Sequence, residues 1–146
     1  PSSQPWQSNN VGDLLTRGIN IRTTYALALT NQSKFNFMLG YSYLESEFKN
    51  INTDLASKYL ISALKHQFTN TVDFKYQKLS ALFATRFNQR MSGPSYWIND
   101  VRVSQSIAQF TIFLDAQNIF NTTYFEVGAI PLPSRWFSLG VKFVQL

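Results

Sequence analysis

The chain has 146 residues, of which 45% are hydrophobic, 16% aromatic and only 14% charged, whereas an average soluble domain carries about 25% charged residues. It has no cysteine, which excludes a disulfide framework and thiolate metal sites. The net charge of +5 is spread thinly, with Arg86 and Arg90 the nearest approach to a basic cluster, so composition argues against nucleic-acid binding. No stretch approaches the roughly 18 apolar residues of a membrane helix.

Seven segments alternate between apolar and polar residues with a period of two, which predicts β-strands with two different faces. In the first segment, for example, Ile19 and Ile21 alternate with Asn20 and Arg22. In chain order the segments cover residues 16–30, 35–48, 64–76, 79–90, 100–104, 110–117 and 136–146. The polar faces are rich in Asn, Ser, Thr and Gly and poor in Lys and Glu. The sequence therefore predicts an all-β, antiparallel fold.

The connections between these segments alternate between short and long. Short turns are expected at residues 31–34, 77–78 and 106–109, and longer loops at 47–63, 89–96 and 119–135. Successive connections of an antiparallel sheet lie at opposite ends of the sheet. All the short turns are therefore expected at one end and all the long loops at the other. Outer-membrane β-barrels have this asymmetry, with tight periplasmic turns and long extracellular loops.

Aromatic residues gather near both ends of the predicted strands, as in the two interfacial girdles of a transmembrane barrel. The band at the turn end contains Phe35, Phe74, Tyr76, Phe110 and Phe143. The band at the loop end contains Tyr41, Tyr43, Phe87, Trp97, Phe120, Tyr124, Trp136 and Phe137. The alternative is a soluble β-sandwich or small barrel with its apolar faces turned inward. The loop asymmetry, the two bands and the sparsely charged polar face favour the membrane barrel.

Seven strands do not make a closed bacterial barrel, because single-chain barrels have even strand numbers. Residues 1–14 are rich in Ser, Asn, Gln and Pro and are expected to form an extracellular loop rather than an eighth strand. Small residues such as Gly18, Gly40 and Gly140 would fill the interior of a narrow barrel poorly. We therefore expect residues 1–146 to form the C-terminal part of a larger barrel that ends at Leu146.

The last thirty residues carry a recognisable motif. The chain reads Asn118-Ile119-Phe120-Asn121, then Tyr124, then Pro133-Ser134-Arg135, then a closing strand with Phe137, Gly140 and Phe143. This order resembles the C-terminal signature of TonB-dependent outer-membrane receptors, with Ser134 where that family commonly has Gly. The chain also ends in Leu146 rather than in an aromatic residue. From the residues alone, Asn118 and Asn121 are expected to satisfy backbone groups freed at a strand end.

The resemblance implies a barrel of about 22 strands that is blocked by a plug domain not contained in this chain. It implies a bacterial outer-membrane transport protein that imports a scarce nutrient such as a siderophore, haem, a cobalamin or a glycan. The implied partners are the remaining barrel strands and the plug of the same receptor, outer-membrane lipid and, indirectly, the TonB complex. Nucleic acid is not among them, and no cofactor is implied.

Charged and aromatic residues supply the candidate site residues. Inward-facing Arg22, Arg86, Arg102 and Asp73, together with Asp100 and Asp115, are predicted to line the lumen, where they either contact a plug or remain solvated wall charges. Tyr96 and Trp97, in a predicted loop, are candidate ligand contacts because loops on a rigid scaffold often carry binding.

Enzyme motifs are scarce. Two Ser-x-x-Lys matches, at 46–49 and 62–65, lack their companion elements, and His66 is the single histidine. No catalytic residue, metal site or enzymatic activity is predicted. The sequence favours a transport component, with a smaller outer-membrane pore or a soluble β-barrel binding module as the alternative and an outer-membrane enzyme as a weaker third option.

Overall fold

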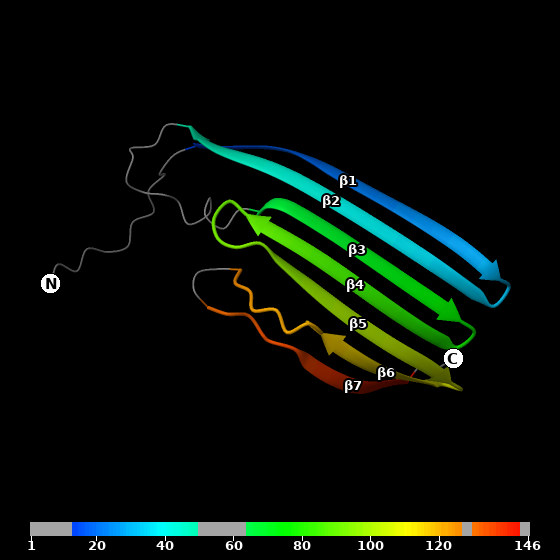
Figure 1. The fold of residues 1–146 in the computed structure, drawn as a ribbon. Coiled ribbons are helices and arrows are strands. Elements are labelled where there is room, and N and C mark those ends of the chain that lie inside the picture. The colour runs from blue at the N-terminus through cyan, green and yellow to red at the C-terminus, as the bar shows by residue number, and fades with distance from the viewer. Residues whose placement is uncertain (1–12, 50–63, 127–129, 144–146) are drawn as a thin grey trace.

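The computed structural model describes residues 13–49, 64–126 and 130–143. They form one seven-stranded antiparallel sheet in which every strand pairs with its neighbour in the sequence (Figure 1). The strands are β1 (Asp13–Thr30), β2 (Ser33–Lys49), β3 (Leu64–Tyr76), β4 (Leu79–Arg90), β5 (Tyr96–Ile107), β6 (Phe110–Gln117) and β7 (Trp136–Phe143). The predicted all-β, antiparallel architecture is therefore confirmed. The described segments contain no helix that is both long and apolar enough to cross a bilayer.

The predicted connections have the expected alternation of lengths. Two-residue turns at 31–32, 77–78 and 108–109 lie at one end of the sheet, which we call the turn end (Figure 1). Longer connections at 91–95 and 118–135 lie at the opposite loop end. Residues 50–63, most of the predicted loop 47–63, lie outside the described residues.

Backbone hydrogen bonds join the neighbouring hairpins at the turn end. The amide of Gln77 donates to the carbonyl of Gln32 at 2.9 Å, and the amide of Ser106 donates to the carbonyl of Lys78, also at 2.9 Å. Hydrogen bonding between neighbouring hairpins therefore continues as far as the turns, and no long loop extends from the turn end of the described sheet.

Some strand boundaries differ from the prediction. The third, fourth and sixth predicted segments have the observed bounds, but β1 begins at Asp13, so the last two residues of the predicted loop 1–14 belong to a strand. The largest difference is β5, which spans twelve residues instead of the predicted 100–104. At its loop end Tyr96 and Ile98 lie on the otherwise polar face, and this reversal of the alternation concealed the strand.

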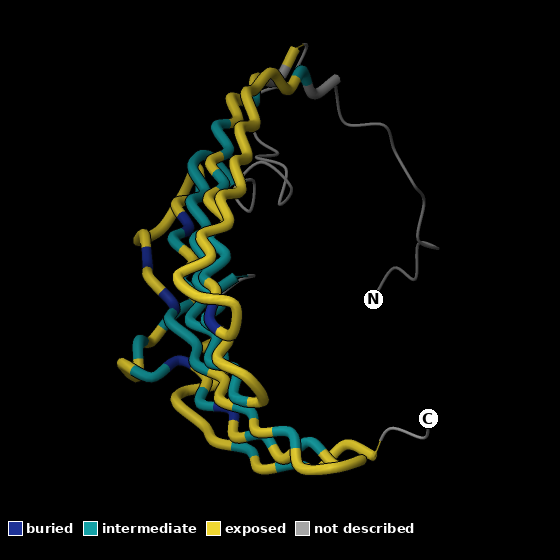
Figure 2. Tube along the Cα trace, turned by 90° about the vertical axis from the view of Figure 1, so that its right-hand side faces the viewer, coloured by how far each residue is buried: buried dark blue, intermediate teal, exposed yellow. Residues whose placement is uncertain are grey.

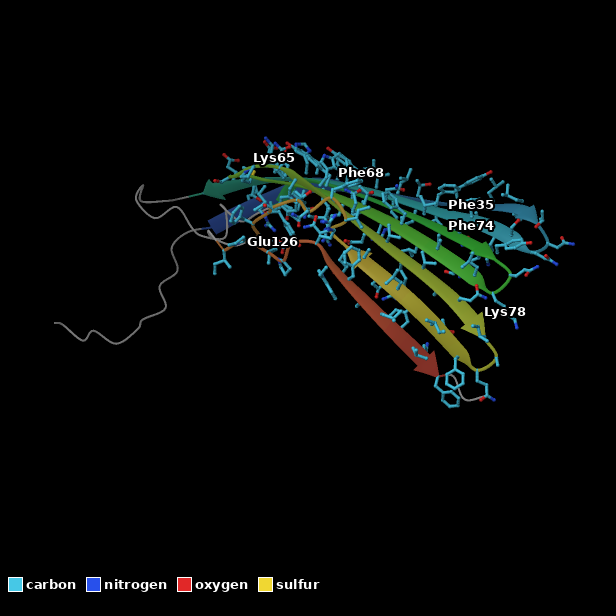
Figure 3. All side chains as sticks on the ribbon, turned by 60° about the horizontal axis from the view of Figure 1, so that its bottom comes forward. Phe35, Lys65, Phe68, Phe74, Lys78 and Glu126 are labelled. Atoms are coloured by element: carbon cyan, nitrogen blue, oxygen red, sulfur yellow. The ribbon has the colours of Figure 1, made fainter. Side chains whose placement is uncertain are left out.

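The register places most apolar residues of the seven strands on one face, called the apolar face, and most Arg, Asp, Ser and Thr residues on the other, called the polar face. In Figure 3, Phe68 and Glu126 mark the two sides of the sheet. Large apolar side chains are exposed on the apolar face, and many residues of the polar face are exposed as well. On β7 Leu139 is 74% exposed, whereas Asp115 on the polar face of β6 is 8% exposed.

The sheet is open. Seen from its turn end it forms an arc, with β1 and β7 as its two edges (Figure 2). No other described strand pairs with the outer edge of either β1 or β7. Each edge is therefore a row of unpaired backbone groups that requires a further strand or another cover.

Aromatic pairs bridge adjacent strands near both ends of the apolar face. Phe35 and Phe74 have ring centroids 4.6 Å apart at the turn end, and Phe87 and Trp97 have centroids 4.8 Å apart at the loop end. Two residues of the predicted loop-end band do not lie on the apolar face. Trp136 shares its face with Gln117 by register, so it lies on the polar face, where Tyr124 also packs.

Candidate functional site

The described residues between β6 and β7, 118–126 and 130–135, fold back over the loop end of the polar face and are called the segment below. β6 stops at Gln117, and Asn118 and Asn121 both have positive φ angles, 48° and 57°. Asn tolerates this left-handed conformation better than most residues because its short polar side chain can bond locally. The motif Asn118-Ile119-Phe120-Asn121 is therefore a turn that redirects the chain across the sheet.

Hydrogen bonds from the two asparagines hold this turn. The Asn118 side chain is buried; its Nδ2 donates to the carbonyl of Thr122 at 2.8 Å and its Oδ1 accepts from the Thr122 amide at 2.9 Å. The Asn118 amide donates to Oδ1 of Asp100 at 2.8 Å. Asn121 Oδ1 accepts from the Arg135 amide at 3.0 Å, which joins the two ends of the segment. Both side chains thus bond to backbone groups freed at a strand end, as expected from the sequence.

An aromatic stack fastens the middle of the segment. The rings of Tyr124 and Tyr96 lie 4.9 Å apart, and Tyr96 is only 5% exposed. The Tyr96 hydroxyl accepts from Asn88 Nδ2 at 3.0 Å and donates to Glu126 Oε1 at 3.3 Å. Burial raises the pKa of Tyr124 above its usual value, so its hydroxyl stays neutral throughout the physiological pH range. Tyr96 and Ile98 are the two buried apolar residues of the described chain, and both lie beneath this segment.

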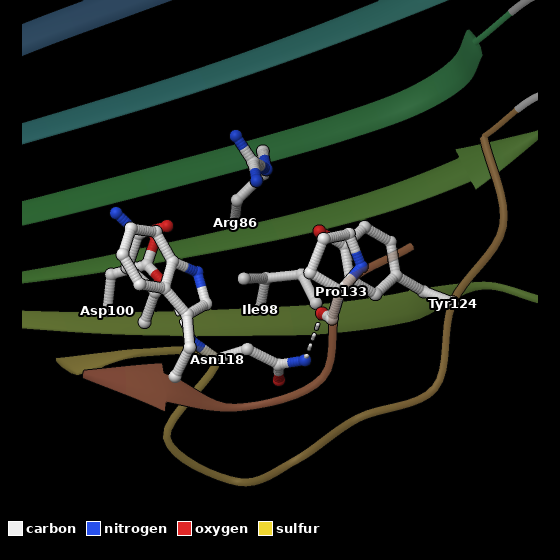
Figure 4. A pocket seen from close by; sticks show the side chains of 8 residues that line it. Arg86, Ile98, Asp100, Asn118, Tyr124 and Pro133 are labelled. Atoms are coloured by element: carbon white, nitrogen blue, oxygen red, sulfur yellow. Dashed lines mark hydrogen bonds between the residues drawn. The ribbon is translucent and has the colours of Figure 1, made fainter. Parts of the chain in front are cut away.

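A pocket of about 400 Å³ lies between the segment and the sheet (Figure 4). Its wall consists of Arg86, Ile98, Asp100, Gln117, Asn118, Tyr124, Pro133 and Trp136. One guanidinium, one carboxylate, two amides and two aromatic rings can hold a polar or aromatic group by hydrogen bonds and stacking. The described residues include no group of three or more His, Cys, Asp or Glu side chains that could hold a metal ion, and the pocket wall contains no Ser, Cys or His.

All six predicted lumen residues lie on the polar face, and the surroundings of four of them, Arg22, Asp73, Arg86 and Arg102, differ. Arg102 forms a bidentate pair with Asp115, and its guanidinium lies 5.1 Å from the centre of the Phe113 ring. Asp73 accepts from Asn36 at 3.4 Å and pairs with Lys75 at 3.4 Å. A third residue, Arg86, is exposed and lines the pocket, which makes it the one best placed for an external group.

Arg22, the fourth of these residues, is exposed on β1, in register with Gly40. Whether any of the four contacts a plug remains a prediction.

Tyr96 and Trp97 do not form a common site. They are the first two residues of β5 rather than part of a loop, and consecutive strand residues point to opposite faces. Tyr96 is buried under Tyr124, whereas Trp97 is 48% exposed on the apolar face, where it packs against Phe87 and Phe68. The sequence analysis missed Ile98, Gln117, Pro133 and Trp136 as pocket residues. The sequence did contain one signal for these pocket residues, which is the reversed alternation at 96–99. It places apolar side chains on the polar face, where another part of the chain must cover them.

The pair between Arg102 and Asp115 connects β5 to β6, and Ser138 on β7 donates to Asp115 at 3.4 Å. We expect Asp115→Ala to lower the free energy of unfolding by about 1 kcal/mol rather than the 3–5 kcal/mol of a fully buried pair, because the Arg102 side chain is 55% exposed. Denaturant unfolding of the single variants and of the double variant with Arg102→Ala would measure the coupling. Additive effects of the two substitutions would contradict a direct interaction.

No protein-family model matches the sequence, and no curated protein matches it.

Proposed function

We propose that this chain is part of the barrel wall of a TonB-dependent outer-membrane receptor and that the whole receptor imports a scarce nutrient. The observation that carries the proposal is the exposure of the two faces. Apolar side chains of β6 and β7 such as Leu114, Leu139 and Val141 are exposed, while the polar face shelters Asp115 and Ser138. Water disfavours this arrangement and a lipid environment favours it.

The open edges add support. In hydrocarbon each unsatisfied backbone group costs several kcal/mol, so only closed barrels and helices span a bilayer. The proposed receptor supplies the missing partners of β1 and β7 from its other strands, and its width suits a polar face that carries Gly40, Gly140 and solvated arginines. The short turns at one end and long connections at the other agree with periplasmic and extracellular sides.

The C-terminal motif supports the family assignment. Its two asparagines form the turn that leads the chain over the polar face. Asn118 also donates to the Pro133 carbonyl and Asn121 accepts from the Arg135 amide, so the end of the segment is bonded to its start. The pocket beneath this segment opens on the polar face, which is the lumen side in a receptor. It is therefore a candidate place for contact with a passing nutrient or with the plug, through Arg86 and the rings of Tyr124 and Trp136.

Fractionation of the native protein tests the proposal. We expect it in the outer-membrane fraction, migrating differently in heated and unheated gels and at a mass far above the 16.8 kDa of this chain. A soluble 16.8 kDa species would refute the proposal, since the apolar faces would then be covered inside a soluble protein. A heat-modifiable species no larger than this chain would favour the smaller pore instead.

Single cysteines would test the orientation, because the chain has none of its own. Ser92 lies in the exposed connection at the loop end, and Lys78 lies in a turn at the opposite end. We expect a membrane-impermeant maleimide to label the Ser92→Cys variant on intact cells, and the Lys78→Cys variant only after the outer membrane is permeabilised. Labelling of both variants on intact cells would contradict a wall that spans the membrane.

A further inference from the structure

The pocket on the polar face contains polar side chains whose hydrogen-bonding groups are not used by the segment (Figure 4). Among the described residues, the side chains of Arg86, Gln117 and Tyr124 form no hydrogen bond or ion pair. Asp100 accepts from the Asn118 amide with Oδ1 only, and its Oδ2 has no donor in the same part of the chain. The guanidinium supplies donors, the amide supplies donors and an acceptor, and the hydroxyl both donates and accepts. A ligand can therefore be bonded without breaking any bond that holds the segment.

Part of the pocket wall is a row of residues that crosses β5, β6 and β7. Gln117 pairs with Trp136 across β6 and β7. Val101 pairs with Ala116 across β5 and β6, so Asp100 and Gln117, the next residues on the two strands, are neighbours on the polar face. The row spans two strand spacings, or about 10 Å. The strands therefore hold a carboxylate, an amide and an indole ring side by side along the pocket.

Trp136 is the unusual member of this row. The polar face of β7 otherwise carries Ser138, Gly140 and Lys142, yet the indole ring is 45% exposed there. Its flat apolar surface is available for stacking, and ligand pockets combine such aromatic surfaces with a few placed polar groups. The ring can therefore cover an apolar patch of a ligand while the neighbouring amide and carboxylate bond to the polar groups of that ligand.

The charges of the pocket disfavour a strongly charged ligand. Arg86 and Asp100 both line the pocket, so an anion that approaches the guanidinium is repelled by the carboxylate, and a cation that approaches the carboxylate is repelled by the guanidinium. A neutral group that both donates and accepts can bond to either side chain, and hydroxyl groups have this property. Sugar rings combine neighbouring hydroxyls with an apolar C–H surface, so they match both the polar and the aromatic parts of the wall.

We propose that this pocket binds a sugar ring of a neutral oligosaccharide. The C–H surface of the ring stacks on Trp136, and its hydroxyls bond to Asp100, Gln117 and Arg86. The volume of about 400 Å³ lies within the usual range of about 300–1,000 Å³ for small-ligand sites. The inference deepens the proposed function and rests on it, because it names the imported nutrient as a neutral glycan and requires the polar face to line the lumen.

The test uses the full receptor, purified from outer membranes in mild detergent and applied to an array of neutral oligosaccharides. The array includes glucans, mannans, xylans, galactans, fructans and chitin fragments, and we expect binding to at least one of them. The affinity for that oligosaccharide, measured by calorimetry, should change little between low and high salt, because screening weakens the binding of charged ligands. A ferric catecholate siderophore, haem and cyanocobalamin serve as probes of the other nutrient classes and should not compete.

Two exposed tryptophans on opposite faces supply a matched pair of variants. Trp136→Ala should weaken binding of the oligosaccharide about tenfold, as expected for the loss of a stacked aromatic ring. Trp97 has a similar exposed fraction, 48%, but lies on the apolar face, so Trp97→Ala should leave the affinity unchanged. Gln117→Leu removes the donors and the acceptor of the amide at similar volume and should weaken binding about fivefold. Arg86→Gln keeps a donor and should cost no more than Gln117→Leu.

Binding to no oligosaccharide of the array, or equal affinity of Trp136→Ala and the wild type, would overturn the proposal. A loss of about a hundredfold in Arg86→Gln would overturn the neutral class and indicate an anionic ligand. Release of the plug at a lower denaturant concentration in Trp136→Ala, without loss of affinity, would also overturn it and identify the pocket as a plug contact. If Trp136→Ala does not fold, Gln117→Leu tests the same wall, because Gln117 is exposed. Failure of the proposed function itself is separately visible, since the maleimide pattern of the Lys78→Cys and Ser92→Cys variants does not depend on the pocket.

Discussion

Arginine in place of Val103 should prevent the receptor from assembling in the outer membrane. Val103 lies on the apolar face of β5, in register with Ala81 and Leu114, and is 40% exposed. If this face contacts lipid, a guanidinium on it costs up to about 2–4 kcal/mol, the value at the bilayer midplane, which is a large part of the total stability of many proteins. The measurement is the amount of heat-modifiable protein in the outer membrane.

The control is the same substitution one residue further along the strand. Ser104 lies on the polar face, in register with Ser80 and Phe113, where an arginine remains in contact with water. Ser104→Arg should assemble at close to the wild-type amount. The side chains of Val103 and Ser104 are both accessible to solvent in this chain. A soluble protein in which water contacts both faces of the sheet would therefore tolerate both arginines. Equal assembly of the two variants would contradict a lipid-facing wall, and equal loss would indicate that β5 simply does not accept a long side chain.

The strands could be predicted where the alternation is interrupted only at single residues. In β3 and β4 the interruptions, at Asn70, Leu82 and Thr85, are each followed by the same alternation, so the bounds of both strands could be predicted. In β5 it reverses, because Tyr96 and Ile98 lie on the polar face under a segment that comes twenty or more residues later in the sequence. A periodicity measured along one strand contains no information on such a distant cover.

The pocket could not be predicted for the same reason. Arg86, Asp100 and Trp136 come from three strands and line one pocket only because the segment folds back onto the sheet. The motif with Asn118 and Asn121 indicated where a strand ends, and its hydrogen-bonding role followed from the chemistry of Asn. The direction in which the chain then turns depends on two positive φ angles and on the stack of Tyr124 against Tyr96, which spacing alone does not reveal.

Replacing Tyr96 with alanine should release the segment from the polar face. The ring is 5% exposed and stacks on Tyr124, and its hydroxyl bonds to Asn88 and Glu126. Truncation of a buried aromatic residue typically costs 3–5 kcal/mol. The cost should be local, since Tyr96 holds the middle of the segment, whereas its start is held separately by Asn118 and by the bond from the Ile119 amide to the Asn99 carbonyl at 2.9 Å. The expected result is frequent opening of the segment without unfolding of the sheet, and loss of any binding that uses the pocket.

The rate of maleimide labelling in an Ile98→Cys background measures this opening, because Ile98 is 3% exposed beneath the segment. With Tyr96 present the introduced thiol should react slowly, and Tyr96→Ala should raise its rate about a hundredfold, as expected for a loss of about 3 kcal/mol in local stability. Tyr96→Phe keeps the ring and removes only the hydroxyl, so its effect should be nearer to fivefold. Trp97→Ala removes the neighbouring ring from the opposite face and should leave the rate unchanged. If the thiol at position 98 stays protected in Tyr96→Ala, the hydrogen bonds of Asn118 and Asn121 hold the segment by themselves, and the stack is not what keeps the pocket closed on this side.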